Sequence, residues 1–162
     1  MNPVTAGVAA SISAVILNAA AADLKVTGSL AAQMDPKGPP ASCRLTKATS
    51  TLLHYGVRLN VGNKTGLGSK FVSIVFEVVP YKGAGKYNAA DKQFGDTPVE
   101  ATLQTQGMPG VEEKWLATSG VLVITDGASP TLSGTVEADL SPTKTKAGAI
   151  HLSGPWSCTV EK

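Results

Sequence analysis

The sequence predicts an all-β fold, namely an antiparallel β-sandwich or a barrel-like variant of it, with about eight or nine strands. Three observations support this fold class. Apolar and polar residues alternate with a period of two in several segments, which is typical of strands with one buried face. Turn-forming residues, including many of the 17 glycines and 10 prolines, separate these segments at intervals of about ten residues. Threonine, serine and valine dominate between the turns, as they do in strands.

The alternation places the strands in order along the chain. In segment 129–140 the apolar residues share one face, and the hydroxyl and acidic residues share the other. Segment 71–79 is largely apolar on both faces, which predicts a central strand that is partly covered on each side. Turns are expected at Gly62-Asn63 and Asp126-Gly127, and the proline-rich stretch 35–40 is expected to be an irregular connection. The full set of expected strands is 23–30, 42–48, 53–61, 71–79, 98–106, 112–117, 120–125, 129–140 and 147–160.

Length and charge limit the domain organisation and the class of partner. The 162 residues predict a single β-domain at 23–162, preceded by an apolar segment at 1–22. The net charge is +2, and the lysines and arginines are scattered along the chain. Because binding to nucleic acid or to an anionic membrane surface requires concentrated basic residues, neither is an expected partner.

The apolar segment 1–22 contains no charged residue and allows two interpretations. As a secretory signal peptide, it has an apolar stretch and the small-residue pattern Ala20-Ala21-Ala22 before Asp23, but no basic residue at its start. As a retained helix, its apolar residues recur with the 3.6-residue period and form one stripe. A stable membrane span is not expected, because polar residues dilute a segment of minimum length.

The two cysteines are predicted to form a disulfide bond. In the last expected strand Trp156 and Cys158 share a face, so both side chains should point into the core. Cys43 lies in an early expected strand. An even number of cysteines, the signal-like segment and the all-β composition together favour a Cys43–Cys158 disulfide, and hence an extracellular or cell-surface location. The alternative is two unpaired buried cysteines in a cytosolic protein.

These residues carry a resemblance to a group of known domains. With an early Cys43 and the closing pattern Gly154-x-Trp156-x-Cys158, the region 23–162 resembles exported or lipoprotein-type β-domains of bacteria. The chain departs from the lipoproteins because no cysteine follows its apolar N-terminal segment. The resemblance implies an exported binding or assembly module and implies nothing about a ligand.

No catalytic residue, metal ligand or cofactor is expected from the motifs. His54 and His151 each lie alone in an expected strand, and neither has a carboxylate at a characteristic metal-ligand spacing. The cysteines lack C-x-x-C spacing, and the sequence contains neither a calcium-loop motif nor a G-x-S-x-G nucleophile elbow. A hydrolase with a site assembled from separate strands is therefore the least favoured class.

The candidate binding element is the segment 81–95, which is expected to be a loop. Aromatic residues interspersed with polar residues on a rigid scaffold provide flat contact area for a protein or carbohydrate partner. Trp115 is a second candidate contact. In the alternative interpretation Tyr81 and Tyr87 cap the core, and Trp115 packs inside it. The candidate contact residues in the loop are Tyr81, Lys82, Lys86, Tyr87, Asn88 and Phe94.

Two functions follow as expectations. The first is a non-catalytic binding module, outside the cell or at its surface. The second is a structural subunit of an extracellular homo-oligomeric assembly such as a filament, in which residues 1–22 form a helix packed between protomers.

Overall fold

The computed structural model describes most of the predicted β-domain. The described residues are 24–28, 32–34, 42–46, 51–61, 70–90, 100–107, 114–126, 130–144 and 148–161. They form no helix and ten strands: β1 (Lys25–Gly28), β2 (Ala32–Met34), β3 (Ser42–Thr46), β4 (Thr51–Val61), β5 (Lys70–Val78), β6 (Gly85–Asn88), β7 (Ala101–Gly107), β8 (Trp115–Asp126), β9 (Thr131–Pro142) and β10 (Ile150–Val160). Within this described part, no helix is long and apolar enough to cross a membrane.

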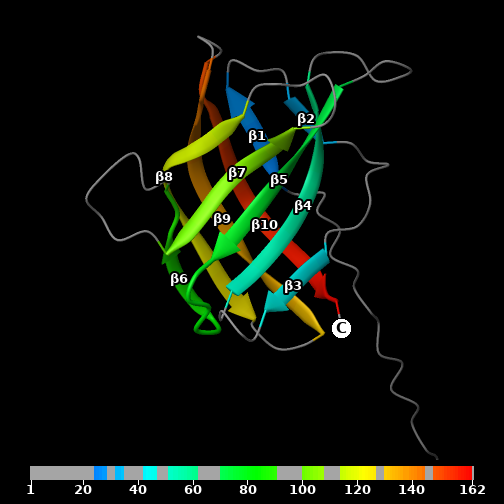
Figure 1. Cartoon of the computed structure of the whole chain (residues 1–162), viewed down its shortest axis with the longest axis vertical. Coiled ribbons are helices and arrows are strands. Elements are labelled where there is room, and N and C mark those ends of the chain that lie inside the picture. The colour runs from blue at the N-terminus through cyan, green and yellow to red at the C-terminus, as the bar shows by residue number, and fades with distance from the viewer. Residues whose placement is uncertain are drawn as a thin grey trace, which may run out of the picture.

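All ten strands belong to one curled sheet (Figure 1). Neighbouring strands run antiparallel except for the parallel pair β10–β3. The pairing runs from β10 through β3, β4, β5, β7, β8 and β9 and returns to β10. The all-β antiparallel prediction is therefore confirmed, and the sheet adopts the barrel-like variant, in which one continuous sheet curls around the core.

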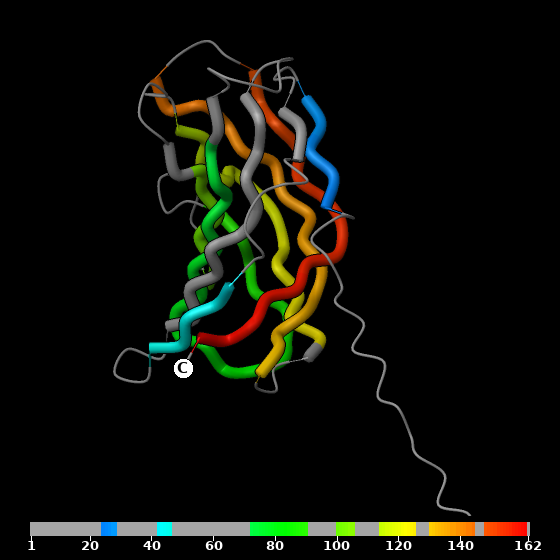
Figure 2. Tube along the Cα trace, turned by 90° about the vertical axis from the view of Figure 1, so that its right-hand side faces the viewer, coloured from blue at the N-terminus to red at the C-terminus, as the bar shows by residue number. Residues whose placement is uncertain are grey.

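The core fills the space between two walls of this sheet, one containing β5 and β7 and the other containing β9 and β10 (Figure 2). The predicted alternation is confirmed in β9, whose inward residues are buried while the outward ones remain accessible. Phe76 from β5 meets Trp156 from β10 edge to face, with ring centroids 5.9 Å apart. The most buried large side chains are Val72, Ile74, Phe76, Val78, Leu103, Leu122, Ile124, Leu140 and Leu152.

The set of strands differs from the predicted set in three places. The expected strands 112–117 and 120–125 are not separate, because residues 115–117 and 120–125 belong to one strand, β8, with a register shift between Ala117 and Ser119. This shift is a β-bulge, which inserts a residue without ending the strand. Strands β2 and β6 were not expected from the sequence, and β6 lies inside the segment predicted as a loop.

Besides the candidate contact Phe94, four sequence predictions lie outside the described residues. They are the signal-like or helical segment 1–22, the connection 35–40, the turn at Gly62-Asn63 and the Gly127 position of the turn after β8.

Candidate functional site

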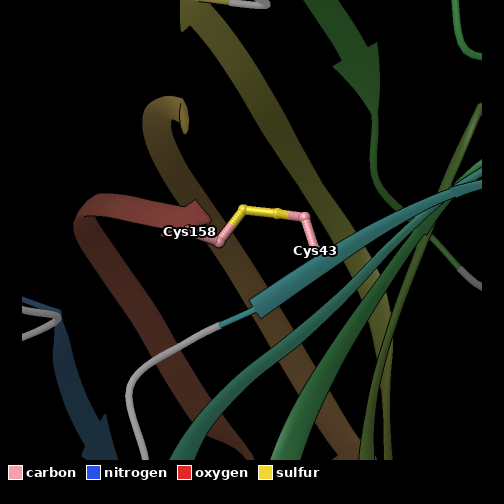
Figure 3. The surroundings of a disulfide bond; sticks show 2 residues. All are labelled: Cys43 and Cys158. Atoms are coloured by element: carbon pink, nitrogen blue, oxygen red, sulfur yellow. A yellow bond between two sulfur atoms is a disulfide. The ribbon is translucent and has the colours of Figure 1, made fainter. Parts of the chain in front are cut away.

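The predicted disulfide between Cys43 and Cys158 is present (Figure 3). Cys43 comes from β3 and Cys158 from β10, and their Cα atoms lie 5.6 Å apart. Both cysteines are buried, in the same core cluster as Trp156. The inward orientation predicted for Trp156 and Cys158 is thus confirmed, because residues two apart on a strand point to the same face.

The candidate binding segment is divided between the core and the surface. Tyr87 is only 4% exposed, and Tyr81 is half-buried and packs against the core. The Lys82, Lys86 and Asn88 side chains are exposed around β6. The structure therefore places the two tyrosines at positions that favour core packing, the alternative left open by the sequence. The remaining candidate, Phe94, lies outside the described residues.

The Tyr87 hydroxyl organises the turn that precedes β6. It accepts a hydrogen bond from the Lys82 backbone N–H at 3.1 Å and donates one to the Gly83 carbonyl oxygen at 2.6 Å. These two bonds hold the turn against the core and fix the backbone from which Lys82 and Lys86 project. Tyr87 thus acts on the candidate surface as a support for the exposed residues.

We expect Tyr87→Phe to lower the free energy of unfolding by about 1 kcal/mol, because it removes two hydrogen bonds and keeps the ring. Tyr87→Ala should lower it by about 3 kcal/mol or more, since the buried ring is also lost. Urea denaturation followed by circular dichroism measures both changes. Lys86→Ala is the matched control on the same strand and should leave the midpoint unchanged. Equal effects of Tyr87→Phe and Lys86→Ala would show that the hydroxyl does not support the turn.

Trp115, the second candidate contact, is a core residue with only 3% of its surface exposed. Its backbone N–H donates to Thr105 Oγ1 at 3.0 Å. Its indole N–H donates to the Gly148 carbonyl oxygen at 3.3 Å. These bonds join β8 to β7 and to the segment before β10, and they favour the core-packing alternative for Trp115.

A cluster centred on His151 was not expected from the sequence. It lies on the outer face of the sheet, where His151 of β10 is the register partner of Asp139 in β9. The Nδ1 atom of His151 is 2.9 Å from Asp139 Oδ1, and its Nε2 atom is 3.0 Å from Glu137 Oε1. The Ser119 hydroxyl donates to Asp139 Oδ2 at 3.2 Å.

The geometry of this cluster suits a structural role. Both ring nitrogens of His151 are engaged by carboxylates, so neither is available to take a proton from a serine nucleophile, as general-base catalysis requires. The two carboxylates approach opposite edges of the ring, so the three side chains do not converge on one point as the ligands of a metal ion must. Within the described residues, no group of three or more metal-ligating side chains has the arrangement of a metal site.

The pKa values of the cluster shift in opposite directions. The hydrogen bond to Asp139 raises the pKa of His151 above its ordinary value of 6.5, and the negative charge of Glu137 adds to this effect. The hydrogen bond from His151 lowers the pKa of Asp139 below its ordinary value of 3.8, with a further contribution from Ser119. In both cases the neighbouring group favours the charged form.

These shifts predict the sign of a pH effect on stability. The contribution of His151 is fully present below about pH 6.5 and is lost as the pH rises through the raised pKa of the folded state. The contribution of Asp139 is present above about pH 3.8 and is lost as the pH falls through the lowered pKa. Because the three side chains are 36 to 69% exposed, we expect each contribution to stay below about 1 kcal/mol.

An NMR titration of His151 tests this prediction. In a His54→Gln background only one of the two histidines remains, and it should titrate above pH 6.5. Adding Asp139→Asn should move the titration back towards pH 6.5, because the charged hydrogen-bond partner is lost. A His151 pKa at or below 6.5 in the His54→Gln background would contradict the geometry.

Comparison with protein-family models, with characterised proteins and with solved structures finds no match to this chain.

Proposed function

We propose that the chain acts outside the cytosol as a non-catalytic binding module for a protein or carbohydrate partner. The disulfide supports the location, because buried disulfides persist in oxidising compartments and are rare in the cytosol. We do not propose a hydrolase, because the hydroxyl of Tyr87 donates a hydrogen bond to Gly83 and the ring of His151 is paired with Glu137 and Asp139.

One observation carries the binding role, namely the composition of the outer face where β6, β8 and β9 adjoin. The register aligns Lys86 with Val123 and Thr135, and Asn88 with Val121. The two valines are half-buried, whereas Lys86, Asn88 and Thr135 are exposed. We call these five residues the β6–β9 face.

The β6–β9 face has the layout of a small contact surface. Partly apolar residues lie at its centre and long or hydrogen-bonding polar residues at its rim, as in protein–partner interfaces. The alternate residues of β6, β8 and β9 are buried in the core and fix the backbone of these strands. Little conformational freedom of the backbone would therefore be lost on binding. Glu137, the exposed register partner of Val121 in β9, adjoins this face, and Lys82 is exposed in the turn before β6.

Screens of the purified full chain against a glycan array and a protein array test this proposal. A partner found in either screen should lose about tenfold or more in affinity towards the Lys86→Glu/Asn88→Ala/Val123→Asp variant, which disrupts both the centre and the rim. The matched control is Lys114→Glu/Lys144→Glu, which changes exposed lysines outside this face. Equal loss in both variants, or no loss in either, would contradict the assignment of the face.

The location has its own test. Thiol titration of material purified from the native source without reductant should find no free cysteine. If both cysteines titrate as free thiols and the folded protein does not form the disulfide with oxidised glutathione, the proposed location outside the cytosol is wrong, whatever the outcome of the binding screens.

A further inference from the structure

The circuit of paired strands contains two junctions with little backbone pairing. Among the described residues, β7 and β8 share one register pair, Gln104 with Leu116. The parallel strands β10 and β3 share two, Thr159 with Ser42 and Val160 with Cys43. By contrast, β10 pairs with β9 over ten residues, from Ile150 to Thr159.

The β7–β8 junction is reinforced by non-covalent contacts. The Trp115 backbone N–H donates to the buried hydroxyl of Thr105 across it. Ala89 and Ala90, which directly follow β6, also link the two strands. The Ala89 N–H donates to the Gly120 carbonyl of β8, and the Ala90 N–H donates to the Ala101 carbonyl of β7. This junction therefore has several links besides its single register pair.

The β3–β10 junction, which we call the seam, is reinforced by a covalent bond. The Glu161 N–H donates to the Cys43 carbonyl oxygen at 2.8 Å across the seam. The Cys43–Cys158 disulfide joins the same two strands (Figure 3). On its other side β3 keeps five register pairs with β4. The neighbouring Val160 N–H donates to Pro130 on the β9 side and does not cross the seam.

We propose that the Cys43–Cys158 disulfide is a redox-operated latch, so that its reduction opens the seam while β3 stays on β4 and β10 stays on β9. For both strands the β3–β10 pairing is weaker than the pairing on the other side, namely β3 with β4 and β10 with β9. Parallel pairs are slightly less stable per residue than antiparallel pairs, and this one spans only two residues. The proposal goes beyond the binding role and holds independently of the β6–β9 face.

A dithiol is the class of reductant that this latch requires. Both cysteines are buried, so the reductant reaches the sulfur atoms when the short β3–β10 pairing opens locally. Its thiolate then attacks the Cys158 sulfur, the S–S bond breaks, and Cys43 leaves as a thiolate that takes a proton. The second thiol of the reductant then displaces Cys158. Two electrons and two protons pass to the protein, and the reductant becomes a cyclic disulfide. Opening exposes the facing edges of β3 and β10, and an exposed strand edge is a template for pairing with another strand.

Hydrogen exchange measured by NMR on the full chain, with and without dithiothreitol, tests the proposal at two adjacent amides. In the oxidised protein both Glu161 and Val160 should be protected. After reduction the Glu161 amide should exchange faster by a factor on the order of ten or more, whereas the Val160 amide should stay protected, because its bond does not cross the seam. The Glu161 exchange should also be insensitive to low urea, as local opening exposes little surface.

The Cys43→Ala/Cys158→Ala variant serves as a permanently unlatched form. It should show the exchange pattern of the reduced protein, and dithiothreitol should not change it. Three results would overturn the proposal: a Glu161 amide that keeps its protection after reduction, a common exchange rate for all amides with one urea dependence, or loss of all dispersed amide signals in both the reduced protein and the variant. The last result would mean that the rest of the sheet does not survive without the bond.

Discussion

Replacing Cys43 and Cys158 together by alanine is expected to lower the free energy of unfolding by about 5 kcal/mol. The bond joins residues 115 positions apart, and a cross-link that closes so long a loop removes much conformational entropy from the unfolded chain. Since domains of this size are stable by about 5–15 kcal/mol, the loss would be a large part of the total. The change is measured by urea denaturation of the variant and the oxidised wild-type protein.

Reduction separates the effect of the bond from that of the side chains. Wild-type protein in dithiothreitol should lose nearly the same stability as the double variant, and the variant itself should not respond to the reagent. The slope of free energy against urea should also rise on reduction, because an unfolded chain without the cross-link exposes more surface. A wild-type midpoint that does not move on reduction would show that the bond contributes nothing to stability.

The strands that the sequence predicted well are those with one buried face. In β9 and β10 the alternation of apolar and polar residues is nearly complete, and burial follows it along each strand. The period of two determines which side chains point inward whatever the neighbouring strand is. For the same reason the inward direction of Trp156 and Cys158 was predictable from their parity, that is, from their even-numbered positions in a strand whose even-numbered residues are apolar. The parallel pairing of β10 with β3 was not, because strand order depends on contacts distant in sequence.

The β6 strand shows where alternation fails. Its residues Gly85–Asn88 include neither a β-branched residue nor more than one inward apolar side chain, and turn residues surround them. A four-residue strand of this kind is stabilised by its pairing with β8 and by the burial of Tyr87. Tertiary contacts of this sort override local propensity. The sequence therefore indicated a loop where the structure has a strand.

The same limit explains why the His151 cluster was missed. Glu137 and Asp139 lie on the outward face of one strand and His151 on the outward face of the next, and the sequence shows both facts. Their contact depends on the register of the β9–β10 pair, which the connection between the strands determines. A slip of two residues would preserve every inward and outward assignment and still separate His151 from Asp139. Parity is therefore predictable here, whereas register is not.

In β8 the sequence correctly indicated an irregularity in the backbone near residue 118, but it was predicted as a break between two strands. Two separate strands were predicted here, 112–117 and 120–125, with a break at Thr118 and Ser119. The structure has a β-bulge there instead, between Ala117 and Ser119. Gly120 follows it with φ of +153°, and a Cβ atom at Gly120 would lie 2.6 Å from the Cβ atom of Ala138. An isolated glycine inside a strand pattern is equally a signal for a bulge or a close approach of two backbones.

Gly134→Ala is expected to lower the free energy of unfolding by about 3 kcal/mol or more. Gly134 lies in β9 opposite the second bulge of β8, between Ile124 and Asp126. A Cβ atom at this position would meet the carbonyl oxygen of Val123 and would lie 2.8 Å from its carbonyl carbon. Because the obstacle is backbone rather than the end of a flexible side chain, the β8–β9 pair itself must move apart, and interiors at crystal-like packing density resist such shifts.

Gly85→Ala is the matched control, because Gly85 lies in β6 in the same cross-strand row and pairs with the same residue, Ile124. A Cβ atom at Gly85 would have no heavy atom within 4 Å, apart from those of Gly85 itself and its two neighbours in the chain. Its substitution should therefore cost only about 1 kcal/mol, from the positive φ that the backbone adopts there. Thermal denaturation and urea denaturation of the two variants measure the difference. If they are equally stable, then the close approach of β8 to β9 at Gly134 is not a constraint on the fold, and the bulge opposite it is not the reason for a glycine at this position.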